Sequence, residues 1–283
     1  MTTANPSNNS DTGRVHHKEC TGDALVTVKA HQNDEDITLF GSCFCPFVQR
    51  VWLAFEILGV PYKYYEIDPY TNPKPKELLE VSPKGLVPGL RFNRYTPARS
   101  LNESTVILDY LEDLAATTTK RSILPLISNP YARGLAKLQG DHVNRNLVPA
   151  FYRYLQAQTE EKQIEGGKDF HASLVGLVAL LERAEREIGL GLWIPGETEL
   201  GWADVMAGPW LLRAKIVLTH YRGFQLPSGD RFNGWLTRLC EHPVFKSTSS
   251  TDQLYLDSYE RYAFNRPNTS QVANAINEGK ALP

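Results

Sequence analysis

Residues 41–50 read GSCFCPFVQR and join a short apolar segment, residues 37–40, to an amphipathic one, residues 46–58. Pro46 suits the first position of a helix, where its missing N–H costs nothing, so Cys45 is predicted to lie at or next to the N-cap. A cysteine there faces unpaired amides and the positive end of the helix dipole, which can lower a thiol pKa from about 8.5 to roughly 3.5–7.5. We therefore expect Cys45 to be a nucleophile.

The other cysteines have a simpler interpretation. A free cysteine is more often a small buried hydrophobic residue whose role is packing, and we prefer this for Cys20, Cys43 and Cys240. Cys45 differs because proline follows it directly and opens an amphipathic helix. Cys43 is two residues away, but a disulfide closed over one intervening residue would be strained. We expect Cys43 to be a bystander that is open to oxidation.

The composition of the 283 residues limits the class of protein. This length favours two domains. Thirty basic and 32 acidic residues give a net charge of −2 without a basic cluster, so nucleic acid is not an expected partner. The four cysteines match neither a zinc spacing nor a disulfide framework, and no apolar leader or membrane-spanning run is evident. We expect a cytoplasmic protein with no metal site and no membrane partner, with His16 and His17 solvated for want of further ligands.

The pattern of apolar residues predicts an α/β unit followed by helices only. In the α/β unit, strands are expected at 37–40, 62–67, 86–92 and 98–101, and helices at 46–58, at 77–80 and after Asn102 as N-cap. Further along, helices are expected at 129–158, 168–188, 203–220, 232–240 and 253–264. The chain then divides into an N-terminal extension, partly flexible (1–34), an α/β domain (35–116), a linker (117–128) and an all-α domain (129–283) whose last residues, from 265, form a polar tail.

Two smaller features of this pattern have a structural interpretation. Pro88 stands inside the expected third strand, where proline is confined to an edge or a bulge, or marks a cis bond that exposes backbone groups to a ligand. Residues 201–204, GWAD, are typical of a capped helix start in which Asp204 turns back to the cap. We interpret the second motif as a contribution to folding and helix stability.

The N-terminal unit resembles thioredoxin. Its elements follow the order strand, helix, strand, helix, strand, strand, helix (βαβαββα), a cysteine stands at the start of the first helix, and Val-Pro precedes the third strand. With an all-helical domain attached, the chain resembles a glutathione transferase, and more narrowly the omega class with its fungal omega-like members. This resemblance covers most of the chain, from Cys20 to the tail. The motifs that carry it together are Cys45-Pro46-Phe47 with Gln49-Arg50, Lys74-Pro75, Pro83 to Pro88, and Glu103-Ser104.

The resemblance implies a glutathione site, of which Phe47 is also part. In it Val87 pairs its backbone with the cysteinyl part of glutathione, with Pro88 in cis. Glu103 and Ser104 hold the γ-glutamyl ammonium and carboxylate, and Lys74 contacts the glycine end. Such a set suits a ligand with two carboxylates and one ammonium. Taken singly, Lys74 is equally an ordinary surface lysine, and Glu103 an acid that favours the dipole of its helix.

Cysteine at this position separates the chain from transferases that use tyrosine or serine, whose hydroxyl leaves the glutathione thiolate free to attack an electrophile. A cysteine thiolate instead reacts covalently, which favours thiol exchange over conjugation. Val48 stands where dithiol redox proteins carry a second cysteine, so a mixed disulfide at Cys45 must be released by an outside thiol such as glutathione. We expect a glutathione-dependent thiol transferase or deglutathionylase and, from the family resemblance, a homodimer.

The acceptor is expected to be a glutathionylated or small hydrophobic aromatic compound that binds between the domains. Aromatic residues of both domains are candidates to line this cleft: Phe44, Tyr152, Trp210 and Tyr255. Alternatively, the chain is a binding protein of ligandin type that uses the same cleft to sequester polyphenol-like aromatic compounds. Catalytic turnover would then be incidental. A regulator that has lost catalysis is disfavoured because Cys45 and the Glu103-Ser104 pair are present.

Overall fold

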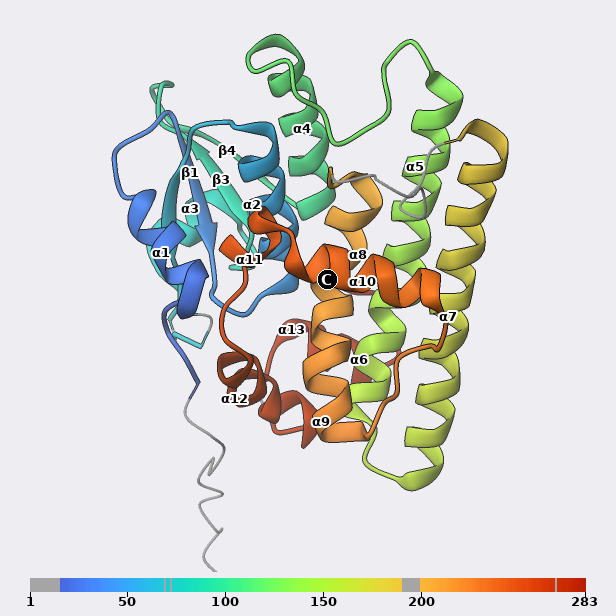
Figure 1. Cartoon of the computed structure of the whole chain (residues 1–283). Helices are drawn as coiled ribbons and strands as arrows, with labels where there is room; N and C mark the ends of the chain where they lie inside the picture. Colours follow the sequence, from blue (N-terminus) through green and yellow to red (C-terminus); the bar gives the residue numbers. More distant parts are fainter. Residues whose placement is uncertain (1–15, 69, 72, 190–198, 268) are drawn as a thin grey trace, which may run out of the picture.

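A small sheet domain packs against a larger group of helices (Figure 1). The computed structural model describes residues 16–283 except 69, 72, 190–198 and 268. Its sheet has the order β2-β1-β3-β4 and contains β1 (Ile37–Gly41), β2 (Lys63–Glu66), β3 (Gly89–Phe92) and β4 (Arg99–Asn102). β2 is parallel to β1, whereas β3 and β4 are antiparallel to their neighbours. A parallel pair needs a crossover connection, which α2 (Pro46–Leu58) supplies.

Both faces of the sheet are covered. Leu39 packs in the main core with side chains of α2 and of α4 (Ser104–Thr117). The next residue, Phe40, points to the opposite face and packs with Leu78 and Val81 of α3 (Lys76–Val81), as expected from the alternation of side chains along a strand. The predicted thioredoxin-like arrangement of the N-terminal domain is therefore confirmed.

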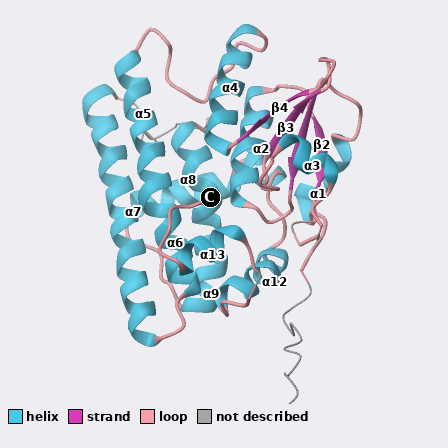
Figure 2. Ribbon diagram, turned by 180° about the vertical axis from the view of Figure 1, so that it is seen from behind, coloured by secondary structure: helices cyan, strands magenta, loops and turns pink. Residues whose placement is uncertain are grey.

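The C-terminal part of the described chain is helical, as predicted. Figure 2 shows α5 and α7 side by side, with α6 continuing the course of α5. Two π-helical turns, η1 (Val143–Leu147) and η2 (Ala214–Leu218), connect α5 to α6 and α8 to α9. The helices are α5 (Pro130–His142), α6 (Val148–Gln156), α7 (Glu160–Ile188), α8 (Trp202–Arg213), α9 (Thr219–Arg222), α10 (Asp230–Glu241), α11 (Pro243–Ser247), α12 (Asp252–Ala263) and α13 (Gln271–Asn277).

Two local predictions about this domain need correction. The third strand begins at Gly89, so that Val87 and Pro88 precede it, joined by a cis peptide bond. Asn102 is the last residue of β4 rather than a helix cap, and Glu103 takes the N-cap of α4. The sequence misled here because Asn102 is needed for strand pairing, opposite Gly89.

The segment expected to be a polar tail contains α13. Ser270 caps this helix by accepting a hydrogen bond from the Ala273 amide at 2.9 Å. Gln156 of α6 donates from Nε2 to the Ala273 carbonyl and to Asn277 Oδ1, both at 3.1 Å. A short helix gains most of its stability from such tertiary contacts rather than from propensity, which explains why a polar composition concealed it.

The described part of the N-terminal extension contains α1 (Gly22–Ala30) and contacts both domains. The Ala24 amide donates to the Ser249 carbonyl at 3.3 Å on the helical side, and the Tyr64 amide of β2 donates to the His31 carbonyl at 2.9 Å.

The start of α8 is closed by a contact within residues 201–204, where the Gly201 amide donates to Asp204 Oδ2 at 2.9 Å and Trp202 is the first helical residue. The folding role inferred for residues 201–204 agrees with this contact.

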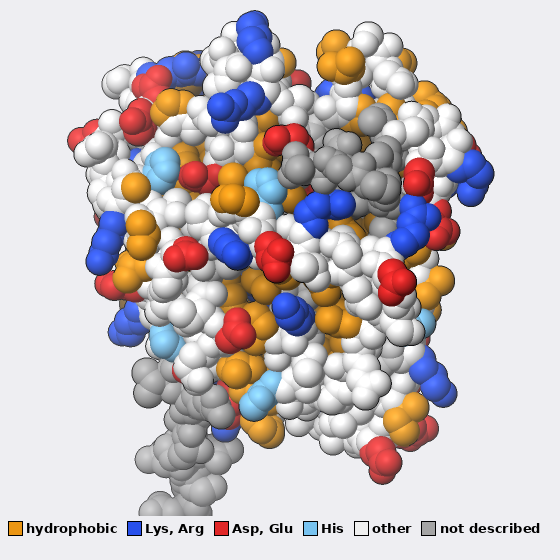
Figure 3. Space-filling view, in the orientation of Figure 1, with side chains coloured by type: hydrophobic (Ala, Val, Ile, Leu, Met, Phe, Trp, Pro, Cys, Tyr) orange, Lys and Arg blue, Asp and Glu red, His pale blue; other side chains and the backbone are white. Residues whose placement is uncertain are grey.

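The surface carries charges of both signs. On the face drawn in Figure 3, acidic and basic side chains alternate with hydrophobic ones and no large area of one sign appears. Within the described ranges, no helix combines the length and the apolar character needed to cross a membrane.

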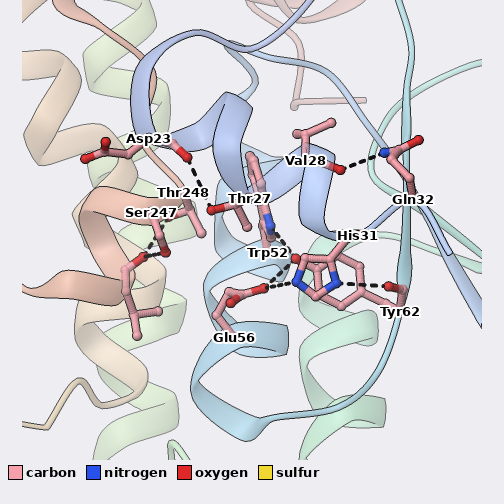
Figure 4. A network of polar contacts seen from close by, with 11 residues as sticks. Asp23, Thr27, Val28, His31, Gln32, Trp52, Glu56, Tyr62, Ser247 and Thr248 are labelled. Atoms are coloured by element: carbon pink, nitrogen blue, oxygen red, sulfur yellow. Dashed lines mark hydrogen bonds and ion pairs between the residues drawn. The ribbon is translucent and has the colours of Figure 1, made fainter.

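The end of α1 is held by a polar network around His31 (Figure 4). His31 Nδ1 lies 3.1 Å from the Tyr62 carbonyl oxygen and Nε2 lies 3.1 Å from Glu56 Oε1, so both ring nitrogens face acceptors. Tyr62 donates its hydroxyl to Glu56 at 2.5 Å and accepts from Trp52 Nε1 at 2.6 Å. The hydrogen bond to Glu56 raises the pKa of His31. Burial raises the pKa of Glu56, but the bonds from His31 and Tyr62 outweigh it and lower that pKa overall.

We expect Glu56→Gln to destabilise the fold more at pH 6 than at pH 9, by about 1 kcal/mol. The raised pKa of His31 means that its contribution is complete below its unfolded pKa and is lost as the pH rises through the folded value. Urea unfolding of both proteins at the two pH values measures the difference. Asp23→Asn, which removes an exposed acid from α1, is the control. An equal cost at both pH values would contradict an ion pair with a charged His31.

Candidate active site

A cavity of about 770 Å³ lies where the sheet domain meets the helices. On the sheet side, its walls are the N-terminus of α2, the loop before β3 and the N-terminus of α4. On the helical side, the walls are η1, α6, the end of α12, and parts of the C-terminal segment. The parts of that segment that line the cavity are residues 269–272, 274, 282 and 283. A concave space with aromatic and polar walls between two domains is where small ligands usually bind.

Cys45 is the N-cap residue of α2, as predicted, with Pro46 at the first helical position. Cys45 lines the cavity, and its Sγ lies 3.9 Å from the Val87 carbonyl oxygen, toward which the thiol donates. The amides of Phe47 and Val48, which are orphan donors of the helix end, also act on the sulfur and favour its thiolate form. The sulfur is thus placed between a free helix terminus and the backbone that precedes β3.

The expectation of a lowered thiol pKa is wrong for this structure. Burial raises the pKa of Cys45 above its ordinary value, and this effect exceeds the opposing influence of the Val48 and Phe47 amides and of the Arg213 and Arg50 guanidiniums. Each group that the sequence predicted to favour the thiolate is present. The sequence could not show how densely the two domains surround this partly exposed sulfur, and desolvation decides the direction of the pKa shift.

Arg213 fixes the loop that carries Cys45. Its side chain is 1% exposed and reaches from α8 into the sheet domain, where Nη2 donates to the Phe44 carbonyl at 2.8 Å and Nη1 to Gln49 Oε1 at 2.7 Å. Nη1 also donates to the Pro209 carbonyl at 2.8 Å, and Nε to the Tyr259 hydroxyl at 2.9 Å. Every nitrogen of this guanidinium therefore has an acceptor, as a buried charge requires.

The cavity brings together all the residues that the resemblance assigns to glutathione. Besides Cys45, it is lined by Phe47, Lys74, Val87, Pro88, Glu103 and Ser104. Lys74 is half-buried, and burial lowers its pKa against the opposing charge of Asp68. Ser104 is buried, whereas the Glu103 side chain is exposed at the mouth. A cation, a carboxylate, a hydroxyl and a helix N-terminus hence line one cavity.

Glu103 has an unusual backbone. Its φ of 71° lies in the left-handed region, which residues other than glycine rarely adopt. Its carbonyl accepts a hydrogen bond from the Ile107 amide at 2.9 Å, which closes the first turn of α4. The strained residue therefore lies directly at the start of this helix. Strained backbone of this kind costs about 1–3 kcal/mol and concentrates at functional sites.

The four predicted acceptor residues divide into two pairs. Phe44 and Tyr152 line the cavity. Trp210 and Tyr255 are almost completely buried and do not line it in the described structure, so these two predictions are wrong. Trp210 packs edge-on against Phe47, with ring centroids 4.9 Å apart, and beneath the Arg50 guanidinium at 4.2 Å. Tyr255 lies 4.6 Å from the Arg213 guanidinium carbon and accepts the Ser250 amide at 2.9 Å.

The sequence analysis missed several residues of the cavity. Tyr70 lies in a loop without periodicity, and Asn144 lies in η1, which no sequence signal distinguished from an ordinary helix. Tyr262 continues the helical stripe of Tyr255 and Tyr259, so that signal was available. The segment from 269 onwards was overlooked, although Ser270 before Val272, Ala273 and Ile276 is a weak signal for a capped amphipathic turn. Among the described residues, no group of three or more His, Cys, Asp or Glu side chains could hold a metal ion.

Comparisons with known proteins agree with this architecture. Residues 39–119 match the family described as glutathione S-transferase, N-terminal domain. Glutathione S-transferase U8 of Arabidopsis thaliana is 34% identical over 182 residues, which cover 63% of this chain and 73% of the relative. The crystal structure of glutathione transferase Omega 3C from Trametes versicolor is similar with a TM-score of 0.72 and 31% identity, covering 87% of this chain and 98% of that one. Rice GST1 in complex with glutathione shares the fold, with a TM-score of 0.65 and 22% identity over 82% of this chain and 99% of that one.

We expect the alkylation rate of Cys45 to keep rising above pH 8.5, by about tenfold per pH unit below its pKa, because only the thiolate reacts. The raised pKa keeps the sulfur protonated at neutral pH. The measurement is iodoacetamide labelling at a series of pH values, followed at the Cys45 peptide by mass spectrometry. A rate that is already constant from pH 6 to pH 8 would instead support a thiolate at neutral pH.

Two substitutions at Glu103 separate backbone strain from side-chain chemistry. Glu103→Gly and Glu103→Ala both remove the carboxylate, but only glycine adopts a φ of 71° without strain. We expect the glycine variant to be more stable than the alanine variant by about 1 kcal/mol. Urea unfolding measures the difference, and an alanine variant as stable as the glycine variant would show that this backbone stores no strain.

Proposed function

Because this chain belongs to the glutathione S-transferase family, we propose that it is a transferase of omega-like type, in which Cys45 forms a mixed disulfide with glutathione. The enzyme class is a glutathione transferase, and glutathione is its co-substrate. The proposal adds thiol transfer and deglutathionylation as the reaction and Cys45 as the reacting group. It is carried by one observation: a cysteine at a helix N-terminus lines the same cavity as Glu103, Ser104 and Lys74.

The surroundings of Cys45 favour a monothiol reaction. Val48 is buried three residues further on, where a resolving cysteine would stand. Cys43 is buried, donates its thiol to the His17 carbonyl at 3.3 Å and has a pKa raised by burial. The described structure hence offers Cys45 no second reactive thiol within its own loop. Release of a mixed disulfide must come from outside, which glutathione can do as a second molecule.

The proposed reaction has two exchanges. Cys45 is a thiol in the resting protein, and it gives up its proton as its sulfur attacks the glutathione sulfur of a glutathionylated substrate. The S–S bond of that substrate breaks as a new one forms between Cys45 and glutathione. The departing substrate thiolate takes up a proton. A second glutathione thiolate then attacks the same glutathione sulfur, which gives glutathione disulfide and regenerates Cys45. The Phe47 and Val48 amides and the Arg50 and Arg213 charges would stabilise the thiolate that forms at each step.

The residues assigned by resemblance have clear tasks in this proposal. The Val87 carbonyl and amide would pair with the cysteinyl part of glutathione and bring its sulfur to Cys45. Glu103 and Ser104 would hold the γ-glutamyl end, and Lys74 the glycine carboxylate. What supports these assignments is that all of these residues line one cavity together with Cys45. The omega-like class is supported by cysteine at position 45 together with the likeness to Omega 3C. We further propose that the protein is a homodimer and that it is located in the cytoplasm.

A second candidate function is binding of aromatic compounds without turnover. The observation that favours it is the ring content of the cavity, since Phe44, Tyr70, Tyr152 and Tyr262 all line it. Aromatic walls of this kind bind planar ligands by stacking and edge contacts. Tight binding of a polyphenol in the absence of glutathione, with no turnover of a disulfide substrate, would favour this function over the enzymatic one.

We expect Cys45→Ser to lower thiol transfer from a glutathionylated test thiol by about a hundredfold or more, because a hydroxyl cannot form the mixed disulfide. Intact mass spectrometry should find one glutathionyl group on the wild-type protein after incubation with glutathione disulfide, and none at position 45 in the variant. Cys43→Ser is the control and should retain both the activity and the adduct. Undiminished turnover of Cys45→Ser would refute the proposed mechanism.

A further inference from the structure

Two arginines are buried beside Cys45, and they differ in how their donors are satisfied. Both Arg50 and Arg213 are 1% exposed. Arg213 has an acceptor for each nitrogen. Arg50 donates from Nε to the Met206 carbonyl at 3.0 Å and from Nη1 to Asn144 Oδ1 at 2.8 Å. Its Nη2 is buried and has no hydrogen-bond partner in the described structure. Because an unsatisfied donor on a buried charge is costly, this nitrogen indicates a missing acceptor.

Asn144 gives a second donor at the same place. Its Oδ1 accepts from Arg50, which leaves the amide nitrogen as a donor, and both residues line the cavity. Asn144 belongs to η1, the π-helical turn between α5 and α6. Such turns re-aim a side chain within a long helix and are frequent at functional sites. The two elements α2 and η1 thus bring a guanidinium and an amide to one part of the cavity wall.

Among the residues that the structure describes, no carboxylate acts on the charge of Arg50. The groups that face it from neighbouring elements are neutral: the Cys45 thiol, the Tyr152 hydroxyl, and the rings of Phe47 and Trp210. No ion pair joins Arg50 to an acid of the described chain. Burial lowers the pKa of Arg50 to about 9, so it is still a cation at neutral pH. In a site of low dielectric, an anion is the ligand that compensates such a charge best.

From this geometry we infer that Arg50 and Asn144 bind a carboxylate of the acceptor substrate, whose aromatic body lies against Phe44, Tyr152 and Tyr262. The inference rests on the proposed function and adds a substrate class to it: aromatic acids carried as glutathione conjugates or mixed disulfides. A carboxylate oxygen would take the bond that Nη2 lacks, and the Asn144 amide would donate to the same group.

The sulfur of Cys45 is a less suitable acceptor for Arg50 than an outside anion. The sulfur has its contact with the Val87 carbonyl, on the side of the cavity assigned to glutathione, and no hydrogen bond joins it to Arg50 in the described structure. A ligand that binds Arg50 therefore need not replace the contact between the Cys45 sulfur and Val87.

The test compares biphenyl-4-carboxylate with biphenyl-4-carboxamide, which have the same shape but differ in charge. Calorimetry at pH 7.5, with the full chain and saturating glutathione, should find that the acid binds at least about tenfold more tightly, equivalent to roughly 1.4 kcal/mol. Arg50→Met should abolish this preference. Asn144→Asp should also abolish it, because a carboxylate placed against Arg50 supplies the counter-charge internally.

Asn144→Asp keeps the test decisive if Arg50→Met fails to fold. Asn146→Asp is the matched control, since it adds the same charge to the same turn at an exposed position, and it should keep the preference for the acid. A wild-type protein that binds both compounds equally, or an Asn144→Asp variant that still prefers the acid, would overturn the inference.

Turnover separates this inference from the proposed function. The glutathione mixed disulfides of 4-mercaptobenzoate and 4-mercaptobenzamide should differ in kcat/KM by the same factor as the two biphenyls differ in affinity. Thiol transfer without a preference for the acid would refute the carboxylate site alone. Preferential binding of the acid without any thiol transfer would refute the proposed function alone, and the carboxylate site would stand.

Discussion

The interaction on which the rest of the structure depends is the burial of the Arg213 guanidinium between the two domains. It lies on α8, yet two of its acceptors, the Phe44 carbonyl and Gln49, belong to the sheet domain. Burying a charge is costly unless all of its donors are paired, so these acceptors must stay where they are. Phe44 directly precedes Cys45, and the same bonds therefore join the domains and position the reactive loop. Domain packing and active-site geometry cannot vary independently in this chain.

The cavity divides its tasks between the two domains. The sheet domain contributes backbone and charged groups at element ends, such as Val87 before β3 and Glu103 before α4, which suit a peptide ligand. The helical domain contributes rings and amides, including Tyr152 and Asn144, which suit a more variable partner. This division follows from the elements themselves: strand and helix ends expose backbone donors and acceptors, whereas the sides of helices expose only side chains.

Local sequence signals were sufficient wherever the deciding contacts are local. Pro46 after Cys45 fixed the start of α2, and Gly59 ends it in a left-handed conformation at a φ of 67°. Trp210 and Tyr255 were misplaced because helical periodicity identifies an apolar face but not which neighbour covers it, and here Arg50 and Arg213 do. The sequence analysis predicted a lowered pKa for Cys45, whereas the pKa is raised, and the reason is related. Desolvation depends on how tightly two domains close over a sulfur, and no spacing of residues within one helix reports that.

The contact made by Gln271 has a consequence for how such enzymes diversify. Its side-chain amide donates to the Lys84 carbonyl at 2.9 Å, so the segment after α12 joins the helical domain to the loop before β3. Gln271 itself lines the cavity. Insertions or deletions in this segment would change the room available to the acceptor while leaving the sulfur and its helix untouched. A change in the length of the C-terminal segment alone can thus alter the preference for bulky substrates while the chemistry at the sulfur stays the same.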